Sequence, residues 1–177
     1  MQKKFRVSVA FVALMAASAP QAAAQVTKGY SDVGVVLGFG NVGAANIAFG
    51  GRYENVFKAL PDLGNGLLGI EVSADVYSYS DAFNSLRFIP VGATANYHFH
   101  IDPKNKVDLF LGAGLGFLAT SCSYKGEFSN GCGGYNSNLY FIGRAGGRYF
   151  FTPSLAAYAD LGAGAATINL GLTFKIK

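Results

Sequence analysis

Two histidines are the residues of this 177-residue chain that could most readily act as a general base. His98 and His100 occur in the stretch HFHI, with Phe99 between them. A hydrolase needs its base within hydrogen-bond reach of a nucleophile, and no serine lies beside either histidine. We therefore predict that the protein is not an enzyme, and we assign no catalytic residue.

The glycine-rich stretch GAGLGF, residues 112–117, has a spacing that also occurs in dinucleotide-binding loops. Such a loop has to open a helix, and no helical pattern follows this stretch. Its glycines are better interpreted as slender positions on the inside of a barrel. We therefore predict no cofactor and no cofactor-binding residue.

Only two cysteines occur, Cys122 and Cys132, within the polar stretch SCSYKGEFSNGC. An even number of cysteines in an exported chain favours a disulfide. A metal site is the alternative, but neither a histidine nor a second cysteine pair lies nearby. We predict a disulfide in a loop, and no metal.

Charged residues recur at short spacings in several strand-like runs. Arg144 and Arg148 are four residues apart, as are Glu71 and Asp75. Residues four apart on one strand point to the same side. Together with Arg52 and Asp160, we predict that these residues form a polar network that fills the inside of a barrel. An ion path gated by Arg144 and Arg148 is the alternative.

The elements that would position these residues follow a segment of a different kind. Lys3, Lys4 and Arg6 precede a short apolar run, and Ala22–Ala24 offers a small-residue cleavage site, so residues 1–24 are predicted to be a secretory signal peptide. Residues 25–177 then form one domain. Without the three basic residues of the signal, 11 of the 14 Lys and Arg remain against 10 Asp and Glu, a balance that gives no reason to expect nucleic acid as a partner.

The predicted domain is all-β. Apolar and polar residues alternate in eight runs separated by turn residues, and 24 glycines argue against long helices. The predicted strands are 30–40, 44–54, 67–79, 85–100, 107–119, 138–151, 154–163 and 166–176. Residues 55–60, NVFKAL, are predicted to make a turn of helix at a membrane interface, within a connection, 55–66, that is long for a turn.

The two faces of these strands differ sharply. One is apolar, as in the last run, where Ile168, Leu170, Leu172 and Phe174 alternate with polar residues or glycine. The other carries nearly all the charges of the strand interiors, and we place His98 on it. Alternation alone does not say which face is inside. Opposite charges in near balance, with large residues among glycines, suit the tight interior of an eight-stranded barrel. An arginine facing lipid would cost about 2–4 kcal/mol at the midplane.

The sequence therefore predicts an eight-stranded antiparallel up-and-down transmembrane β-barrel, apolar outside and polar inside. About ten residues per strand match the height of an outer-membrane barrel's apolar band. His100 would lie near an interface, and Lys175 and Lys177 beyond the bilayer. The aromatic residues expected to form the two interfacial girdles are Tyr53, Tyr77, Tyr79, Phe88, Tyr97, Phe99, Tyr140, Tyr149, Phe150 and Phe151.

The signal peptide, the eight alternating strands, the short turns DPKNK and TPS, and the alternating apolar residues at the end of the chain form one pattern. With this pattern the chain resembles the small outer-membrane proteins of Gram-negative bacteria, in the outer membrane protein A/X-like β-barrel superfamily. The resemblance implies location in the bacterial outer membrane, contact with lipid and lipopolysaccharide, and periplasmic chain ends. It also implies recognition by the barrel-assembly machinery, which in such proteins reads a terminal aromatic residue; here three residues follow Phe174. Residues 41–43, 80–84, 120–137 and 163–166 would face outward.

Some relatives of this kind modify lipid A, using a His-x-Ser pair, which HFHI does not contain. Two function classes remain. The first is a structural or surface-interaction barrel, with loop 120–137 contacting an extracellular partner. The second is a small channel, or a carrier of small or apolar solutes across the outer membrane.

Overall fold

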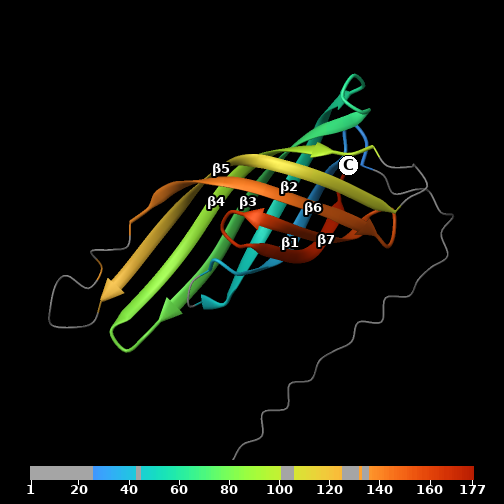
Figure 1. Ribbon diagram of the computed structural model, residues 1–177. Coiled ribbons are helices and arrows are strands. Elements are labelled where there is room, and N and C mark those ends of the chain that lie inside the picture. The colour runs from blue at the N-terminus through green and yellow to red at the C-terminus, as the bar shows by residue number, and fades with distance from the viewer. Residues whose placement is uncertain (1–25, 43–44, 101–105, 125–131, 133–135) are drawn as a thin grey trace, which may run out of the picture.

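The computed structural model is a closed barrel of eight strands, each paired with its neighbours in sequence (Figure 1). It describes residues 26–42, 45–100, 106–124, 132 and 136–177; the predicted signal peptide, residues 1–24, lies outside this part of the chain. The strands are β1 (Ser31–Phe39), β2 (Ile47–Leu60), β3 (Gly66–Ser80), β4 (Asn84–His98), β5 (Val107–Tyr124), β6 (Asn138–Phe150), β7 (Leu155–Ala163) and β8 (Ile168–Lys175).

The pairing of the first and last strands closes the barrel. Val35 of β1 faces Leu172 of β8, and every neighbouring pair around the barrel is antiparallel. Closure leaves no free sheet edge along the paired lengths. The prediction of an all-β, eight-stranded antiparallel barrel is confirmed. Among the described residues, no helix is long and apolar enough to cross a membrane, a finding that does not bear on β-barrels.

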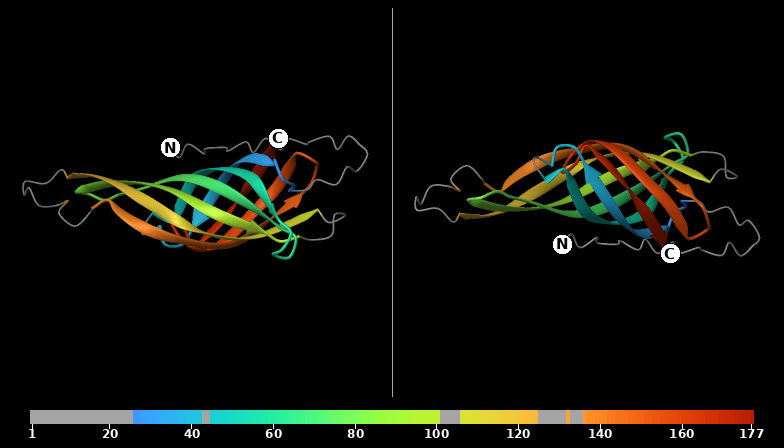
Figure 2. Two further views of the ribbon diagram at one scale, coloured as in Figure 1. Left: turned by 90° about the horizontal axis from the view of Figure 1, so that it is seen from above. Right: turned by 90° about the horizontal axis from the view of Figure 1, so that it is seen from below.

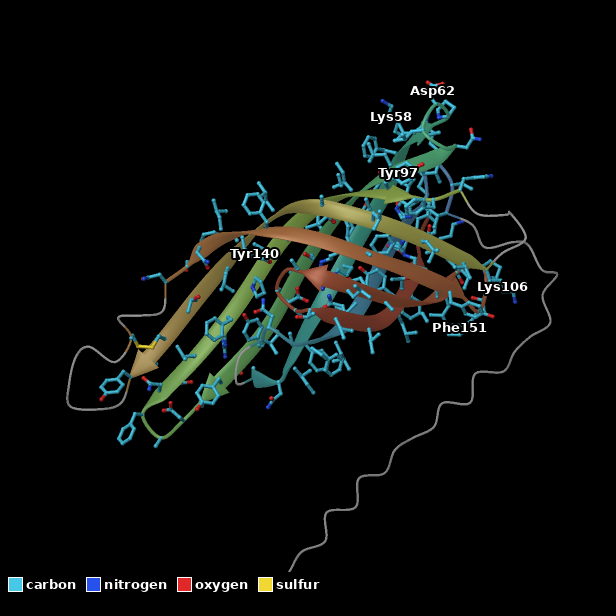
Figure 3. All side chains as sticks on the ribbon, in the orientation of Figure 1. Lys58, Asp62, Tyr97, Lys106, Tyr140 and Phe151 are labelled. Atoms are coloured by element: carbon cyan, nitrogen blue, oxygen red, sulfur yellow. A yellow bond between two sulfur atoms is a disulfide. The ribbon has the colours of Figure 1, made fainter. Side chains whose placement is uncertain are left out.

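The two ends of the barrel are built differently. At the end that we call proximal, β1 begins, β8 ends, and β2 and β3 are joined by a turn at 61–65. Figure 3 places Lys58, Asp62 and Lys106 at this end. At the opposite, distal end lie the connections β1–β2, β3–β4, β5–β6 and β7–β8. Strands β3 to β6 extend beyond the others there, as the green to orange arrows of Figure 2 show.

Strand length explains this overhang. Strand β5 has 18 residues, whereas β1 has nine and β8 has eight. A tilted strand needs about 9–11 residues to cross a bilayer. The distal parts of β3 to β6 therefore exceed what a membrane requires. We call these parts the projecting sheet: residues 77–80, 84–90, 118–124 and 138–142.

Below the projecting sheet, the apolar faces of all eight strands point outward. Val35 of β1, Leu115 of β5 and Leu161 of β7 are each more than half exposed. The charged residues of the same strands are buried inside. The predicted register, apolar outside and polar inside, is confirmed.

The predicted interfacial helix at residues 55–60 is wrong, because β2 continues to Leu60. A register shift between Val56 and Lys58 lets the strand bend there while it stays paired with β3. The connection shrinks to 61–65, where the Tyr97 hydroxyl donates a hydrogen bond to the Leu63 carbonyl. The apparent length of this connection therefore reflects an extended hairpin.

Half of the predicted aromatic girdle is also wrong. Tyr77 and Tyr79 follow Asp75 at intervals of two, so they lie on its inner face. Phe88 pairs with Tyr77, and Tyr140 lines the inside of the distal mouth. Phe150 is buried against Tyr30. The other five residues lie on the outer face: Tyr53, Tyr97, Phe99, Tyr149 and Phe151.

Alternation in the projecting sheet is the inverse of that in the barrel below it. Its inner face carries Tyr77, Tyr79, Leu86, Phe88 and Leu118. On β3, β4 and β5 most residues of its outer face are polar: Ser78, Ser80, Ser85, Arg87, Ser121 and Ser123. Large apolar residues remain outside at Ile89 of β4 and at Leu139 and Phe141 of β6. The reversal marks the level at which these strands leave an apolar surrounding.

Candidate functional site

The barrel interior holds the densest set of charged side chains, and Arg148 lies at the centre of its proximal half. Its Nη1 lies 2.8 Å from Asp108 Oδ2, and its Nε lies 2.9 Å from Asp32 Oδ2. Its Nη2 pairs with Glu54. Arg148 is 2% exposed and Glu54 is completely buried. One guanidinium therefore binds carboxylates from β1, β2 and β5.

His98 joins two of the same carboxylates from β4. Its Nδ1 lies 2.9 Å from Asp108 Oδ1, and its Nε2 lies 3.0 Å from Glu54 Oε1. Asn96 donates a second hydrogen bond to that glutamate oxygen. We call this group, Asp32, Glu54, Asn96, His98, Asp108 and Arg148, the proximal cluster. Both ring nitrogens of His98 are directed at carboxylates.

An apolar layer lies on the distal side of Arg148. Its guanidinium carbon lies 5.4 Å from the ring centre of Phe110 and 5.6 Å from that of Tyr158. The two rings stack at 5.9 Å, and Val36 packs with them. Contacts between a guanidinium and aromatic faces are attractive and gain strength when water is excluded. This layer helps to hold Arg148 in place.

A second group of charges lies beyond this layer. Arg52 Nη1 lies 2.9 Å from Asp75 Oδ1, and Arg144 Nη1 lies 2.9 Å from Asp160 Oδ2. Asn169 connects the two pairs, because it accepts from Arg52 and donates to Asp160. Glu71 lies 3.9 Å from Arg52 Nε. We call this group, Arg52, Glu71, Asp75, Arg144, Asp160 and Asn169, the distal cluster.

Tyr158 links the two clusters. Its ring lies against Arg148, while its hydroxyl lies 2.7 Å from Asp160 Oδ2 and 3.3 Å from Glu71 Oε2. Glycines provide room for these side chains. A Cβ at Gly50 would collide with the Asp75 carboxylate, and one at Gly112 would collide with Asn96. The glycines among the polar residues therefore let long side chains cross the narrow interior.

Apolar residues cover both ends of this interior. At the proximal end, Tyr30, Val56, Phe150 and Ala156 pack together, and the ammonium of Lys175 lies 5.4 Å from the Tyr30 ring centre. Lys175, the last residue of β8, thus lies at the proximal mouth, and its place beyond the bilayer stays a prediction. At the distal end, Val42, Ala48 and Ala166 form a second cluster, against which Tyr77 packs.

The structure places all six residues of the predicted network in the interior but divides them between the clusters. Arg148 belongs to the proximal cluster; Arg52, Glu71, Asp75, Arg144 and Asp160 belong to the distal one. Sequence reasoning missed Asp108 because it adjoins a polar turn. Asp32 and Glu54 lie on the charged face of β1 and β2, but they are not among the six predicted residues.

The near balance of charge that we expected inside is wrong. Six buried carboxylates face three arginines and His98, so acidic groups are in excess. The excess arises mainly at the proximal end, where Asp32 and Asp108 add to Glu54. His98 therefore lies where a further positive charge would be most strongly stabilised.

The cysteine prediction is confirmed in its pairing and corrected in its position. Cys122 and Cys132 form a disulfide. Strand β5 extends to Tyr124, so Cys122 belongs to the strand rather than to the loop 120–137. Residues 125–131 and 133–135 of that predicted loop lie outside the described residues.

His100 lies beyond the end of β4 and is exposed, at the proximal end. It is therefore separate from the buried His98. Among the described residues, the hydrogen-bond partners of the His98 side chain are the carboxylates of Glu54 and Asp108. A base oriented in this way lacks the adjacent hydroxyl or thiol that nucleophilic catalysis requires.

Solved structures show the same architecture. The N-terminal β-barrel domain of OprF from Pseudomonas aeruginosa matches with a TM-score of 0.52 at 16% identity, covering 84% of this chain and 98% of that one. Ail, the attachment invasion locus protein of Yersinia pestis, matches with a TM-score of 0.52 at 14% identity over 84% and 96%. The outer membrane protein OprG from P. aeruginosa gives 0.51 at 10% over 84% and 96%.

No protein-family model matches the sequence, and no curated protein matches it significantly. Identities of 10–16% show a shared fold and leave function to be argued from the residues. The chain thus has the fold of the eight-stranded bacterial outer-membrane β-barrels.

Proposed function

We propose that this protein spans the bacterial outer membrane as a closed, non-catalytic barrel and presents its distal end to the outside for interaction. The observation that carries the proposal is the belt of exposed apolar side chains around a charged interior. Phe49, Val72, Leu111 and Leu172 are each at least 40% exposed, and they come from four different strands. An apolar surface that encircles the molecule is typical of contact with lipid.

The partners of this belt are membrane lipids, with lipopolysaccharide on the outer side. Residues 1–24 would direct export, and the barrel-assembly machinery would insert the chain, with β8 as the strand that it reads. The proximal end would then face the periplasm, because β1 begins and β8 ends there. The five outward-facing aromatic residues lie at positions suited to an interfacial girdle on that side.

The interior acts as a plug in this proposal. Arg148 and its three carboxylates, the Phe110–Tyr158 layer and the distal cluster occupy successive levels of the barrel. A charge that lost its partner in such a confined space would cost several kcal/mol. The clusters therefore favour a structural role over the alternative of a small channel or solute carrier, which requires a continuous path.

The interaction role rests on the projecting sheet. Its length is not needed for crossing the membrane, and its mostly polar outer face on β3 to β5 fits water. The disulfide ties the end of β5 to Cys132, which stiffens this part. Residues 120–137 and the inner face of the projecting sheet would thus contact an extracellular partner.

The test uses the full chain expressed in Gram-negative cells. We expect the protein in the outer-membrane fraction, with different apparent mass on gels before and after boiling. Purified protein in planar bilayers should show no steady conductance. A helical circular dichroism spectrum in folding detergent, or recovery in the soluble fraction, would contradict the membrane barrel. Stable single-channel currents would instead favour the channel.

A further inference from the structure

A cavity of about 240 Å³ opens at the distal mouth, between the projecting sheet and the two shorter loops opposite it. We call it the vestibule. Its lining residues are Asn41, Tyr77, Pro90, Leu118, Asn138, Tyr140, Gly164 and Ala165. Sites for drug-sized ligands have volumes of about 300–1,000 Å³, so the vestibule fits a smaller molecule, about the size of one ring.

The lining is uncharged, and it combines aromatic faces with hydrogen-bonding groups. Tyr77 stacks on Phe88 with ring centres 5.0 Å apart and an angle of 21° between the planes. This stacking gives the Tyr77 ring a fixed orientation. Tyr140 adds a second ring, and the hydroxyls of both tyrosines and the amides of Asn41 and Asn138 can donate and accept.

One side of the vestibule is fixed by a contact between loops. The Asn41 amide donates to the Gly164 carbonyl at 3.1 Å, which joins the β1–β2 and β7–β8 connections. Asn41 adopts a positive φ of 56° in this connection. The vestibule is therefore formed in part before any ligand arrives.

An unpaired donor lies directly behind this wall. Arg144 binds Asp160 through Nη1, while its buried Nη2 has no hydrogen-bond partner among the described residues. A Cβ built on Gly164 would lie 3.0 Å from Nη2, so this nitrogen lies close behind a glycine of the vestibule wall. Unpaired buried donors are rare and costly, and one that adjoins a cavity points to an oxygen-bearing ligand.

We propose that the vestibule binds a single neutral sugar ring. A pyranose has an apolar face of C–H groups that can lie on Tyr77, and a rim of hydroxyls that can meet amides, phenols and a guanidinium N–H. An anionic ring gains little, because Asp160 already neutralises Arg144. A purely apolar solute would leave the amides unpaired. This inference rests on the proposed outward orientation of the distal end.

The test is saturation-transfer NMR on the full barrel in lipid nanodiscs and, separately, in detergent micelles. The probes are the methyl glycosides of glucose, galactose and N-acetylglucosamine, with glucuronate as the anionic probe and indole as the apolar one. We expect transfer to the ring C–H protons of at least one neutral glycoside. The signal should be insensitive to salt, because the lining is uncharged.

Two variants and one control locate the binding. Tyr77→Ala removes the stacked ring, and Asn138→Ala removes one amide; each should weaken binding by about tenfold. Tyr149→Phe removes a hydroxyl from the outer belt at the proximal end and should leave binding unchanged. All three proteins must keep the heat-dependent gel shift, which shows that the barrel is intact.

The outcomes separate this inference from the proposed function. Transfer to no neutral glycoside, or transfer unaffected by both variants, would overturn the sugar site. Saturable binding of indole alone would assign the vestibule to apolar solutes, and preference for glucuronate would assign it to anions. A barrel that binds the sugar in micelles but fails to enter nanodiscs would refute the membrane role and keep the site.

Discussion

The same strands behave differently in the membrane section and in the projecting sheet. On β3, the inner residues Glu71, Ser73 and Asp75 are buried polar groups, and the outer residues Val72 and Val76 are exposed and apolar. Two residues further on, Tyr77 and Tyr79 lie inside and Ser78 and Ser80 lie outside. Asp75 and Val76 do not pair with β4, but pairing resumes beyond them in the same register, with Tyr77 opposite Phe88.

This difference shows that the alternation of side chains along a strand does not indicate whether its outer face meets lipid or water. Alternation of two is kept along all of β3, but the apolar residues move from the outer to the inner face. The register with β4 is the same on both sides of this level, although Asp75 and Val76 themselves do not pair with β4. The outer side chains are apolar where lipid surrounds the strand and polar where water surrounds it. The polarity of the inner side chains depends on the groups that they pack against inside the barrel.

The largest expected effect comes from breaking the proximal cluster. Arg148→Ala removes the cation shared by Asp32, Glu54 and Asp108 and should lower the free energy of unfolding by about 3–5 kcal/mol. Urea titration of the folded and unfolded gel bands in lipid would measure this loss. The same variant should also create a conductance if the network is the plug.

Leu111→Ala is the matched control, because it truncates a side chain that is 51% exposed on the outer belt. It should change the free energy of unfolding by less than about 1 kcal/mol and leave the barrel closed, since no packed cavity forms inside. Equal losses for Arg148→Ala and Leu111→Ala would show that the interior network contributes no special stability.

The second largest effect is the free-energy cost of one added charge, which should differ between the membrane section and the projecting sheet. Val72→Arg places a guanidinium on the lipid-facing side of β3 and should cost about 2–4 kcal/mol near the midplane. Ser78→Arg places it on the same side of the same strand, in the projecting sheet beside Arg87, and should cost less than about 1 kcal/mol. If both substitutions were equally destabilising in lipid, the proposed boundary between Val76 and Ser78 would be misplaced.

A smaller effect should follow reduction of the disulfide. Because Cys122 and Cys132 lie at the distal end, reduction should loosen that end without opening the barrel. We expect an unchanged heat-dependent gel shift in the presence of reductant, together with faster proteolytic cleavage between β5 and β6. Loss of the folded gel band on reduction would mean that the bond supports the whole barrel.

The smallest effect concerns the turn that ends the β3–β4 hairpin. Asp81 accepts hydrogen bonds from the backbone N–H groups of Phe83 and Asn84, at 2.8 and 2.7 Å, which hold the pKa of its carboxyl below the usual value. A depressed pKa contributes stability above the unfolded pKa, and this is lost as pH falls through the folded pKa, that is, below about 4.

Amide chemical shifts of Phe83 and Asn84 should therefore titrate with a midpoint below that of an unstructured aspartate, while the membrane section stays folded. Asp81→Asn should abolish the titration. A midpoint at or above the ordinary aspartate value would contradict the hydrogen bonds in this turn.

The fold could be predicted because the signal repeats in every strand. Ile168, Leu170, Leu172 and Phe174 in β8 alternate with polar residues or glycine, and only one register keeps the arginines of the barrel out of lipid. The terminal strands were predicted to within one or two residues at each end. Cys122 and Cys132 could be paired because they are the only two cysteines of the chain.

Other features depend on tertiary context that alternation does not carry. Tyr77 and Phe88 were assigned to an aromatic girdle because they lie near strand ends, whereas the overhang of β5 places them inside. Residues 55–60 resembled a helix because a bulge interrupts the period of two. Asp108 could have been found from the alternation of β5, since it falls two residues before Phe110 on the inner face.

The most direct test of the account follows single spin labels along β3, at Val72, Ser73, Ala74, Ser78 and Ser80, in lipid vesicles. We expect lipid-soluble oxygen to relax the labels at Val72 and Ala74, and a water-soluble nickel complex to relax those at Ser78 and Ser80. The label at Ser73 should be reached by neither. Strong relaxation by oxygen at Ser73, with Val72 and Ala74 protected, would contradict the register and the inversion above it.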